Sequence, residues 1–286
     1  MSVDLIIQGE DIASADLRAL HTMAAANGIE RIGHVAHQAF RLLRVDATTR
    51  ELVKNHCDAV QLDFAFVPSG RTLADIGLIA MDMDSTLITI ECIDEIADFI
   101  GKKAEVSAVT ASAMRGEINW PESLGRRVTL LAGLEETVLQ RVYDERLKLS
   151  PGAEILIAAA KKNGVKILLV SGGFTFFTER LKARLNIDYA FSNTLEIVNG
   201  KLTGKVNGPL CDADNKARHL RETAAALSLS RERCIAIGDG ANDLKMMHAA
   251  GLSVAYRAKP VVQAQATVAI NRVGLDGVLA LFDCDH

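Results

Sequence analysis

The sequence of 286 residues has few of the residues that interrupt or cross-link a fold. Its 5 prolines and 21 glycines argue against long disordered or fibrous segments. Its 5 cysteines are widely scattered and never spaced as Cys-x-x-Cys, so neither a disulfide framework nor a thiolate zinc site is expected. We therefore interpret the cysteines as small residues of the core.

The chain also lacks long apolar runs and a strong excess of one charge. No run approaches the ~18 residues that a membrane span needs, and residues 1–4 lack the basic and apolar segments of an export signal. The charges of the 32 basic and 36 acidic residues nearly cancel, so the protein has no general electrostatic attraction for nucleic acid or an anionic membrane. We expect a cytoplasmic protein without either partner.

Residues 1 to about 70 form a first unit with its own pattern. An apolar strand over 3–7 opens it, and helical spacing over 13–27 follows, with Gly28 as a plausible C-cap. Three further strands and a helix from about Thr48 complete the order β-α-β-β-α-β. This order is that of the ferredoxin-like split βαβ arrangement, which needs about this length.

A length of 286 residues with 49% apolar content suits two domains. Turn-forming residues at 68–70 predict a linker to a larger domain over 75–286. In that domain, near-continuous apolar strands alternate with helical segments, which is typical of an α/β fold with a parallel sheet covered on both faces. Three loops should meet at the carboxyl edge of the sheet, after the strands Gly77–Met81, Lys166–Val170 and Cys234–Ile237.

A long helical stretch at about 85–150 separates the first of these strands from the next. A parallel crossover needs far fewer residues, so we predict an inserted helical cap over the crevice. Further along, Asn199-Gly200 predicts a β-hairpin. The expected cap helices are Glu91–Ile100, Lys102–Arg115, Glu122–Leu131 and Glu135–Lys148.

Two of the loops at the crevice are rich in carboxylates. Asp82-Met83-Asp84-Ser85-Thr86 follows the first apolar strand, and Gly238-Asp239-Gly240-Ala241-Asn242-Asp243 follows another. If the loops meet, each close carboxylate pair repels by roughly 4 kcal/mol at an effective dielectric constant of about 20. A divalent cation would relieve this repulsion, and all-oxygen ligands favour Mg²⁺ over Zn²⁺. Taken alone, the first pentad is explained about equally well as a turn or helix cap.

Two further features could bind a phosphoryl group. Ser171-Gly172-Gly173 ends an apolar strand and precedes a helix from about Thr175, so its hydroxyl and backbone amides can face an anion. Lys216 lies at the start of another helical run. Each has a plain alternative, because Gly-rich turns are common for steric reasons and most lysines are solvated. Lys216 gains weight because a dianionic phosphate beside several carboxylates needs a cation besides the metal.

Taken together and in this order, these motifs resemble the haloacid dehalogenase superfamily of phosphotransferases, and within it the branch that hydrolyses phosphoserine. The match covers about residues 75–275 and includes the cap residues Glu91 and Met114 and the segment 120–128. The resemblance implies a Rossmann-like parallel sheet with an inserted cap. It also implies release of serine and phosphate from phosphoserine, the last step of serine biosynthesis.

The resemblance implies a role for each matching residue. Asp82 would attack phosphorus and become an aspartyl-phosphate, while Asp84 would act first as general acid and then as general base. Mg²⁺ would be held by the side chains of Asp82 and Asp239 and by the Asp84 backbone carbonyl. Asp243 would act through water or orient Lys216. The residues expected to contact phosphate or substrate are Ser171, Gly172, Gly173, Lys216, Asn242, Glu91, Met114, Trp120 and Arg127.

Selectivity for phosphoserine would come from the cap. The ammonium and carboxylate of phosphoserine require one anion and one bidentate cation, and Glu91 and Arg127 match the family's positions for these groups. Arg126 is the competing neighbour, and only the spacing from Trp120 selects Arg127. Trp120 stands where the family pattern leads us to expect Phe, so the pocket wall is larger. Without the resemblance, we would interpret Glu91 and Arg127 as solvated helical residues.

The first unit has its own resemblance, and two alternative functions stay open. The β-α-β-β-α-β order of residues 1–70 resembles ACT-type amino-acid-binding modules, which implies a regulatory role or a homodimer contact. His34 and His37 have metal-like spacing but no carboxylate or Cys companion, so we interpret them as surface or core histidines. One rival function is hydrolysis or transfer on another small phosphomonoester, such as phosphothreonine or homoserine phosphate. The other is a non-catalytic amino-acid sensor.

Overall fold

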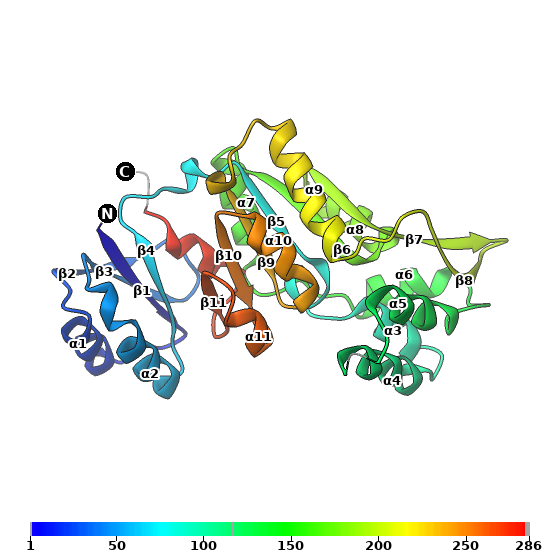
Figure 1. Ribbon diagram of the computed structural model, residues 1–286, viewed down its shortest axis with the longest axis horizontal. Coiled ribbons are helices and arrows are strands. Elements are labelled where there is room, and N and C mark those ends of the chain that lie inside the picture. The colour runs from blue at the N-terminus through cyan, green and yellow to red at the C-terminus, as the bar shows by residue number, and fades with distance from the viewer. Residues whose placement is uncertain (1, 116, 284–286) are drawn as a thin grey trace.

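The computed structural model describes residues 2–115 and 117–283, the side chain of Met114 excepted. It contains a four-stranded sheet at one end, a seven-stranded sheet in the middle and a group of helices at the other end (Figure 1). Among the described residues, no helix has the length and apolar character to cross a membrane.

The four-stranded sheet belongs to the first unit, and its strand order is β2-β3-β1-β4 with antiparallel neighbours. Leu5 and Ile7 of β1 pack with Leu20 and Val53, so both helices cover one face of this sheet. The element order agrees with the predicted β-α-β-β-α-β. The elements are β1 (Val3–Gly9), α1 (Ser14–Met23), β2 (Gly28–Ile32), β3 (Gln38–Leu43), α2 (Arg50–Val60) and β4 (Asp63–Pro68).

The predicted end of the first helix is wrong. Helix α1 ends at Met23, and Ala25 adopts a left-handed conformation with φ 48°, which turns the chain at once. The Asn27 N–H then donates to the Leu43 carbonyl, so pairing with β3 has already begun there. Gly28 is therefore the first residue of β2 and caps no helix.

The seven-stranded sheet has the order β11-β10-β9-β5-β6-β7-β8, and only the β7–β8 pair is antiparallel. That pair is the hairpin predicted from Asn199-Gly200. The parallel sheet predicted for this region is thereby confirmed. Its strands are β5 (Leu78–Met81), β6 (Lys166–Phe174), β7 (Tyr189–Val198), β8 (Lys201–Asn207), β9 (Cys234–Gly238), β10 (Leu252–Tyr256) and β11 (Val268–Ile270).

Helices cover both faces of this sheet because its central strands are apolar on both sides. Ile79 and Met81 of β5 pack in the cluster that contains α7 and α8, whereas Leu78 and Ala80 pack in the cluster that contains α9 and α10. Successive side chains of a strand point to opposite faces, which explains this division. The helices are α7 (Ala153–Lys162), α8 (Thr175–Leu185), α9 (Ala213–Ala226), α10 (Leu244–Ala249) and α11 (Pro260–Gln263).

The helices between β5 and α7 form a separate group beside the carboxyl end of the sheet (Figure 1). The described residues of this region form four helices, as predicted, but the third starts at Trp120 and not at Glu122. The Asn119 side chain accepts the Glu122 N–H, and Pro121 in the first turn needs no partner for a backbone N–H. The cap helices are α3 (Cys92–Asp98), α4 (Lys103–Met114), α5 (Trp120–Thr129) and α6 (Thr137–Glu145).

The first unit packs against the rest of the chain through polar contacts, among them the buried carboxylate of Asp63. The Asp63 carboxylate accepts the backbone N–H groups of residues 271–273 at 2.8 to 3.2 Å. His37 Nδ1 lies 3.4 Å from Asp276 Oδ2, and His34 Nε2 lies 3.1 Å from the Leu279 carbonyl oxygen. The expectation that these histidines lack a carboxylate companion is therefore wrong for His37, because the fold brings Asp276 to it from far along the chain. Among the described residues, the acidic cluster that could hold a metal includes neither histidine.

Candidate active site

The nucleophile candidate Asp82 follows the central strand β5 directly. The β5 strand is entirely buried and runs parallel to β9 on one side and β6 on the other. The Asp82 N–H donates to the Ile237 carbonyl, which extends this pairing by one residue. The loops after the three strands therefore share one edge of the sheet, as predicted.

A buried lysine joins two of the carboxylates. Lys216 Nζ lies 2.6 Å from Asp82 Oδ2 and 2.7 Å from Asp243 Oδ1, and the lysine side chain is 0% exposed. The alternative of a solvated surface lysine is therefore wrong. Burial opposes the charge on this ammonium, but Asp243 and Asp82 outweigh it and raise the pKa of Lys216.

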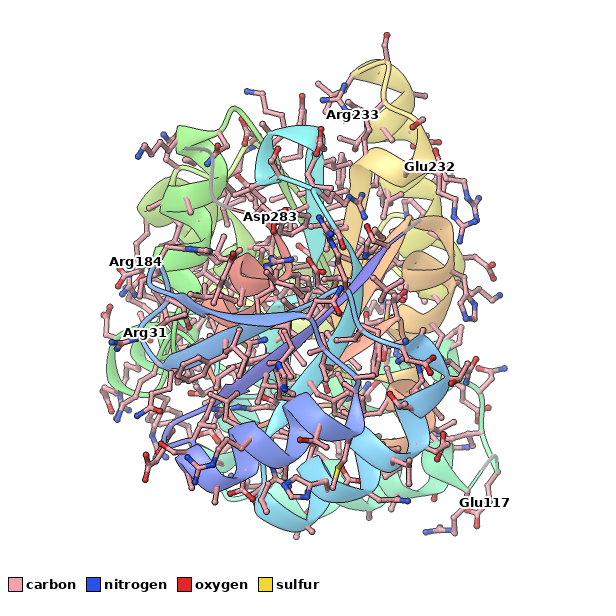
Figure 2. All side chains as sticks on the ribbon, turned by 90° about the vertical axis from the view of Figure 1, so that its left-hand side faces the viewer. Arg31, Glu117, Arg184, Glu232, Arg233 and Asp283 are labelled. Carbon is pink, nitrogen blue, oxygen red and sulfur yellow. The ribbon has the colours of Figure 1, made fainter. Side chains whose placement is uncertain are left out.

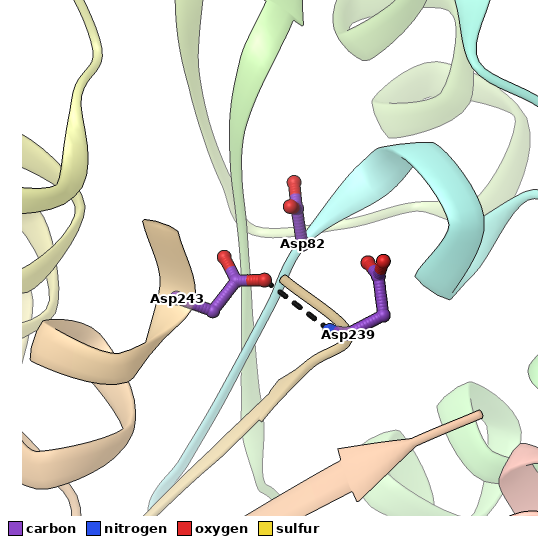
Figure 3. A group of neighbouring side chains, drawn as sticks. All are labelled: Asp82, Asp239 and Asp243. Atoms are coloured by element: carbon purple, nitrogen blue, oxygen red, sulfur yellow. Dashed lines mark hydrogen bonds between the residues drawn. The ribbon is translucent and has the colours of Figure 1, made fainter. Parts of the chain in front are cut away.

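Three carboxylates, those of Asp82, Asp239 and Asp243, surround one small space (Figure 3), and their oxygens lie within 4.8 Å of one another. Asp243 is held in place because its Oδ2 accepts the backbone N–H groups of Asp239 and Gly240. The Thr86 hydroxyl donates to Asp239 Oδ1 at 3.0 Å. The cluster thus joins the loop after β5 to the loop after β9.

The electrostatics of this cluster favour a cation. Burial, and then the neighbouring Asp243, raise the pKa of Asp82 well above its ordinary value, although Lys216 opposes the shift. Burial and Asp243 likewise raise the pKa of Asp239 to about 6. The single positive charge of Lys216 therefore does not balance the negative charges of the carboxylates around it. An all-oxygen donor set of this kind suits Mg²⁺.

Asp84 forms its hydrogen bonds with groups outside the acidic cluster. Its Oδ1 accepts the Cys92 N–H at 2.9 Å, and its Oδ2 lies 3.4 Å from the Ser171 hydroxyl. Burial raises the pKa of Asp84, and the Cys92 N–H offsets only part of the effect. A carboxyl group of this kind can carry a proton, which a general acid requires. Its predicted metal contact was through the backbone carbonyl, and that contact stays a prediction.

The Ser171-Gly172-Gly173 segment belongs to the strand β6, which runs on to Phe174 with an irregularity after Val170. The predicted strand end at Val170 is therefore wrong, whereas helix α8 starts at Thr175 as expected. The Gly173 N–H donates to the Ser171 hydroxyl. A Cβ atom on Gly173 would lie 2.6 Å from Asp84 Oδ2, so only glycine leaves room for that carboxylate.

The cap residues approach the site from α3 and α5. Glu91 directly precedes α3, and its Oε1 accepts the Ser85 hydroxyl at 2.7 Å. The Glu91 side chain is exposed, yet desolvation by nearby protein atoms and the negative charge of Asp84 both raise the pKa of its carboxyl group. Arg127 is half-buried. Burial lowers the pKa of its guanidinium, and the negative charges of Asp94 and Glu91 offset part of this shift.

The structure also describes Arg126, the competing neighbour of Arg127, and bears on two further predicted site residues, Asn242 and Met114. Arg126, the neighbour of Arg127, is exposed and pairs with Glu122 at 2.6 Å. Asn242 is half-buried, and its side-chain oxygen lies over Gly240. Met114 ends helix α4, but its side chain lies outside the described residues.

Sequence reasoning missed several residues that hold the site together. Asn193 donates from Nδ2 to the Gly172 carbonyl and accepts the Cys211 N–H, so it fixes the backbone of the Ser-Gly-Gly segment. Asp94 lies near Arg127, and the Cys92 N–H binds Asp84. A helix over Glu91–Ile100 was predicted here, and the structure has α3 over Cys92–Asp98. Nothing local in the sequence marks Asn193.

Comparisons with known proteins show the family of this chain. The profile of the haloacid dehalogenase-like hydrolase family matches residues 79–248, and a domain of unknown function (DUF4072) matches residues 5–53. The chain is 56% identical over 214 residues to a phosphoserine phosphatase of Polaromonas sp.. That alignment covers 73% of this chain and 91% of the relative.

Solved structures resemble the whole chain, including the first unit. A haloacid dehalogenase family hydrolase from Salmonella enterica serovar Typhi matches with a TM-score of 0.90 and 34% identity, and all of both chains is covered. A probable phosphoserine phosphatase from Vibrio cholerae matches with a TM-score of 0.84 and 40% identity over 98% of this chain and 86% of that one. The chain therefore belongs to the haloacid dehalogenase-like hydrolase family and groups within it with the phosphoserine phosphatases.

Proposed function

We propose that this chain is a phosphoserine phosphatase, an enzyme that hydrolyses O-phospho-L-serine to L-serine and phosphate. The observation that carries the proposal is the 2.6 Å contact between Asp82 Oδ2 and Lys216 Nζ at the buried floor of the site. A carboxylate beside a fixed ammonium suits attack on a phosphate dianion, because the ammonium offsets the repulsion between the two anions. The relatives named phosphoserine phosphatase support the same substrate.

In the first half-reaction, an Asp82 oxygen bonds to phosphorus while the bond from phosphorus to the seryl oxygen breaks. Asp84 gives its proton to the departing oxygen, and the raised pKa of Asp84 favours a protonated start. The Ser171 hydroxyl and the backbone at Gly172–Gly173 bind phosphoryl oxygens together with Lys216. The product is L-serine and an aspartyl-phosphate at Asp82.

In the second half-reaction, the ionised Asp84 removes a proton from a water molecule whose oxygen bonds to phosphorus. The bond between phosphorus and Asp82 breaks, which releases phosphate and restores both carboxyl groups. Asp82, Asp239 and the Asp84 backbone carbonyl would hold Mg²⁺, while Asp243 orients Lys216. When bound, the ion supplies positive charge that offsets these carboxylates and polarises the phosphoryl group.

The cap supplies selectivity. Glu91 binds the substrate ammonium, and Arg127 binds the substrate carboxylate with two parallel N–H donors. The exposed ion pair of Arg126 with Glu122 leaves Arg127 as the cation nearer the site. Trp120 forms a wall of the same pocket, and the predicted contact of Met114 belongs to this wall.

The first unit is an ACT-like, ferredoxin-fold domain over about 1–70, and the phosphatase domain with its cap at about 85–150 extends over 75–286. The strand order β2-β3-β1-β4, with both helices on one face, supports the fold of the first unit. Strand β2 lies at an edge of that sheet and pairs on its outer side with no other described strand, which suits pairing with a second copy. Sedimentation velocity would give a dimer, and a monomer at all concentrations would contradict the pairing.

Phosphate release tests the function. We expect O-phospho-L-serine to be hydrolysed with Mg²⁺, with a higher kcat/KM than phosphothreonine or homoserine phosphate, and no turnover in EDTA. Asp82→Asn should abolish turnover while the circular dichroism spectrum is unchanged. Equal kcat/KM for the three substrates would refute the selectivity, and an active Asp82→Asn enzyme would refute the mechanism.

A further inference from the structure

A cavity of about 550 Å³ lies between the four-stranded sheet and the C-terminal segment, a size typical of small-molecule sites. Thr72 lines it and precedes β5, whose opposite end carries Asp82. The cavity is therefore remote from the phosphatase site. Other lining residues are Glu30, Arg31, Ile32, Leu43 and Phe282.

The floor of this cavity is a buried ionic network. Arg41 Nη1 lies 3.3 Å from Asp4 Oδ2 and 2.9 Å from Asp283 Oδ1, and both Arg41 and Asp4 are buried. Asp4 Oδ1 also accepts the Ser69 hydroxyl and the Arg44 backbone N–H. Buried charges need such partners, so the floor is formed before any ligand arrives.

Two arginines at the rim have no such partners. Within residues 2–115 and 117–283, no side chain forms an ion pair with Arg31 or Arg44 (Figure 2 labels Arg31 and Asp283 at this end of the molecule). Arg44 has φ 51°, an uncommon conformation that its hydrogen bond to Asp4 maintains. A guanidinium presents planar paired donors that match carboxylate or phosphate oxygens.

We propose that this cavity binds a small organic anion. Its carboxylate or phosphate group contacts Arg31 and Arg44, and its apolar part packs on Ile32, Leu43 and Phe282. The walls come from both the first unit and the C-terminal segment, so the bound anion contacts both parts. Because the anion binds the folded chain and not the unfolded chain, it also raises the melting temperature of the protein.

Calorimetric titration of the full chain tests this proposal with three probes of similar shape. Phenylacetate carries a carboxylate, phenylphosphonate carries a dianionic group, and phenylacetamide is neutral. We expect saturable binding of at least one anion, no binding of the amide, and an affinity loss of at least tenfold in Arg44→Ala. The comparison of the two anions identifies the preferred group.

Arg184→Ala is the matched control, since it removes one exposed arginine (Figure 2) that does not line the cavity and forms no ion pair with residues 2–115 or 117–283. This variant should bind the anion as the unchanged chain does, and circular dichroism should show that both variants are folded. Three outcomes overturn the proposal: no saturable binding of either anion, equal binding of the amide, or unchanged anion affinity in Arg44→Ala. The last outcome would place the anion elsewhere, for instance at the phosphatase site.

Discussion

The indole of Trp120 on the cap lies over Gly172 at the end of the sheet, so near that a Cβ atom on Gly172 would lie 2.9 Å from Trp120 Cζ2. Trp120 is the only tryptophan of the chain. The absence of a side chain at Gly172 therefore allows cap and sheet to meet above the site.

Gly172→Ala should separate the two surfaces. Overpacking of this kind costs about 1–3 kcal/mol, so we expect kcat/KM for phosphoserine to fall about tenfold or more. Gly125→Ala, in a cap helix with open space around it, should change kcat/KM little. Trp120→Phe combined with Gly172→Ala should recover part of the loss, and an unimpaired Gly172→Ala enzyme would contradict the contact.

Lys216→Met should leave Asp82 and Asp243 buried without their common cation. Removal of one partner from a buried ion pair lowers the free energy of unfolding by about 3–5 kcal/mol, and we expect a loss of this order in urea unfolding. Turnover should fall at least about a hundredfold. Adding Asp243→Asn should restore stability but not turnover, whereas a stable, active Lys216→Met enzyme would exclude the proposed role.

Asp239 should destabilise the metal-free protein at neutral pH. Its pKa is about 6 in the folded chain, above the ordinary aspartate value of 3.8, so the folded chain binds the proton more tightly and the free energy of unfolding falls as pH rises from about 4 to 6. In EDTA at pH 7, Asp239→Asn should be more stable by roughly 1–2 kcal/mol. This advantage should vanish near pH 4, and Mg²⁺ should raise the melting temperature of the unchanged protein more than that of the variant.

Asp63→Ala should loosen the contact between the first unit and the rest of the chain. It removes the acceptor of three backbone N–H groups at residues 271–273, and a charged hydrogen bond contributes about 1.5–3 kcal/mol. We expect urea unfolding to show a loss of at least about 2 kcal/mol. Asp58→Ala, which removes an exposed carboxylate of the same unit, should have little effect. Equal stability of the two variants would argue against the contact.

Much of the fold was predictable from local pattern. The apolar strands before Asp82, Ser171 and Asp239 are hydrophobic on both faces, and this alone predicts a parallel sheet whose carboxyl edge collects the loops. The glycine-limited helices likewise predict the cap. The errors were at boundaries, such as the end of α1, where tertiary pairing with β3 overrides helical spacing.

The sequence by itself therefore determined which chemical groups are present and on which strand ends they lie, because strand and helix periodicity are local properties. Only the tertiary structure decided that Lys216 is buried between two carboxylates, that Asp84 turns toward Cys92, and that Asn193 supports the Ser-Gly-Gly segment. Those relations join residues far apart in the chain, and their direction depends on side-chain packing that no local pattern encodes.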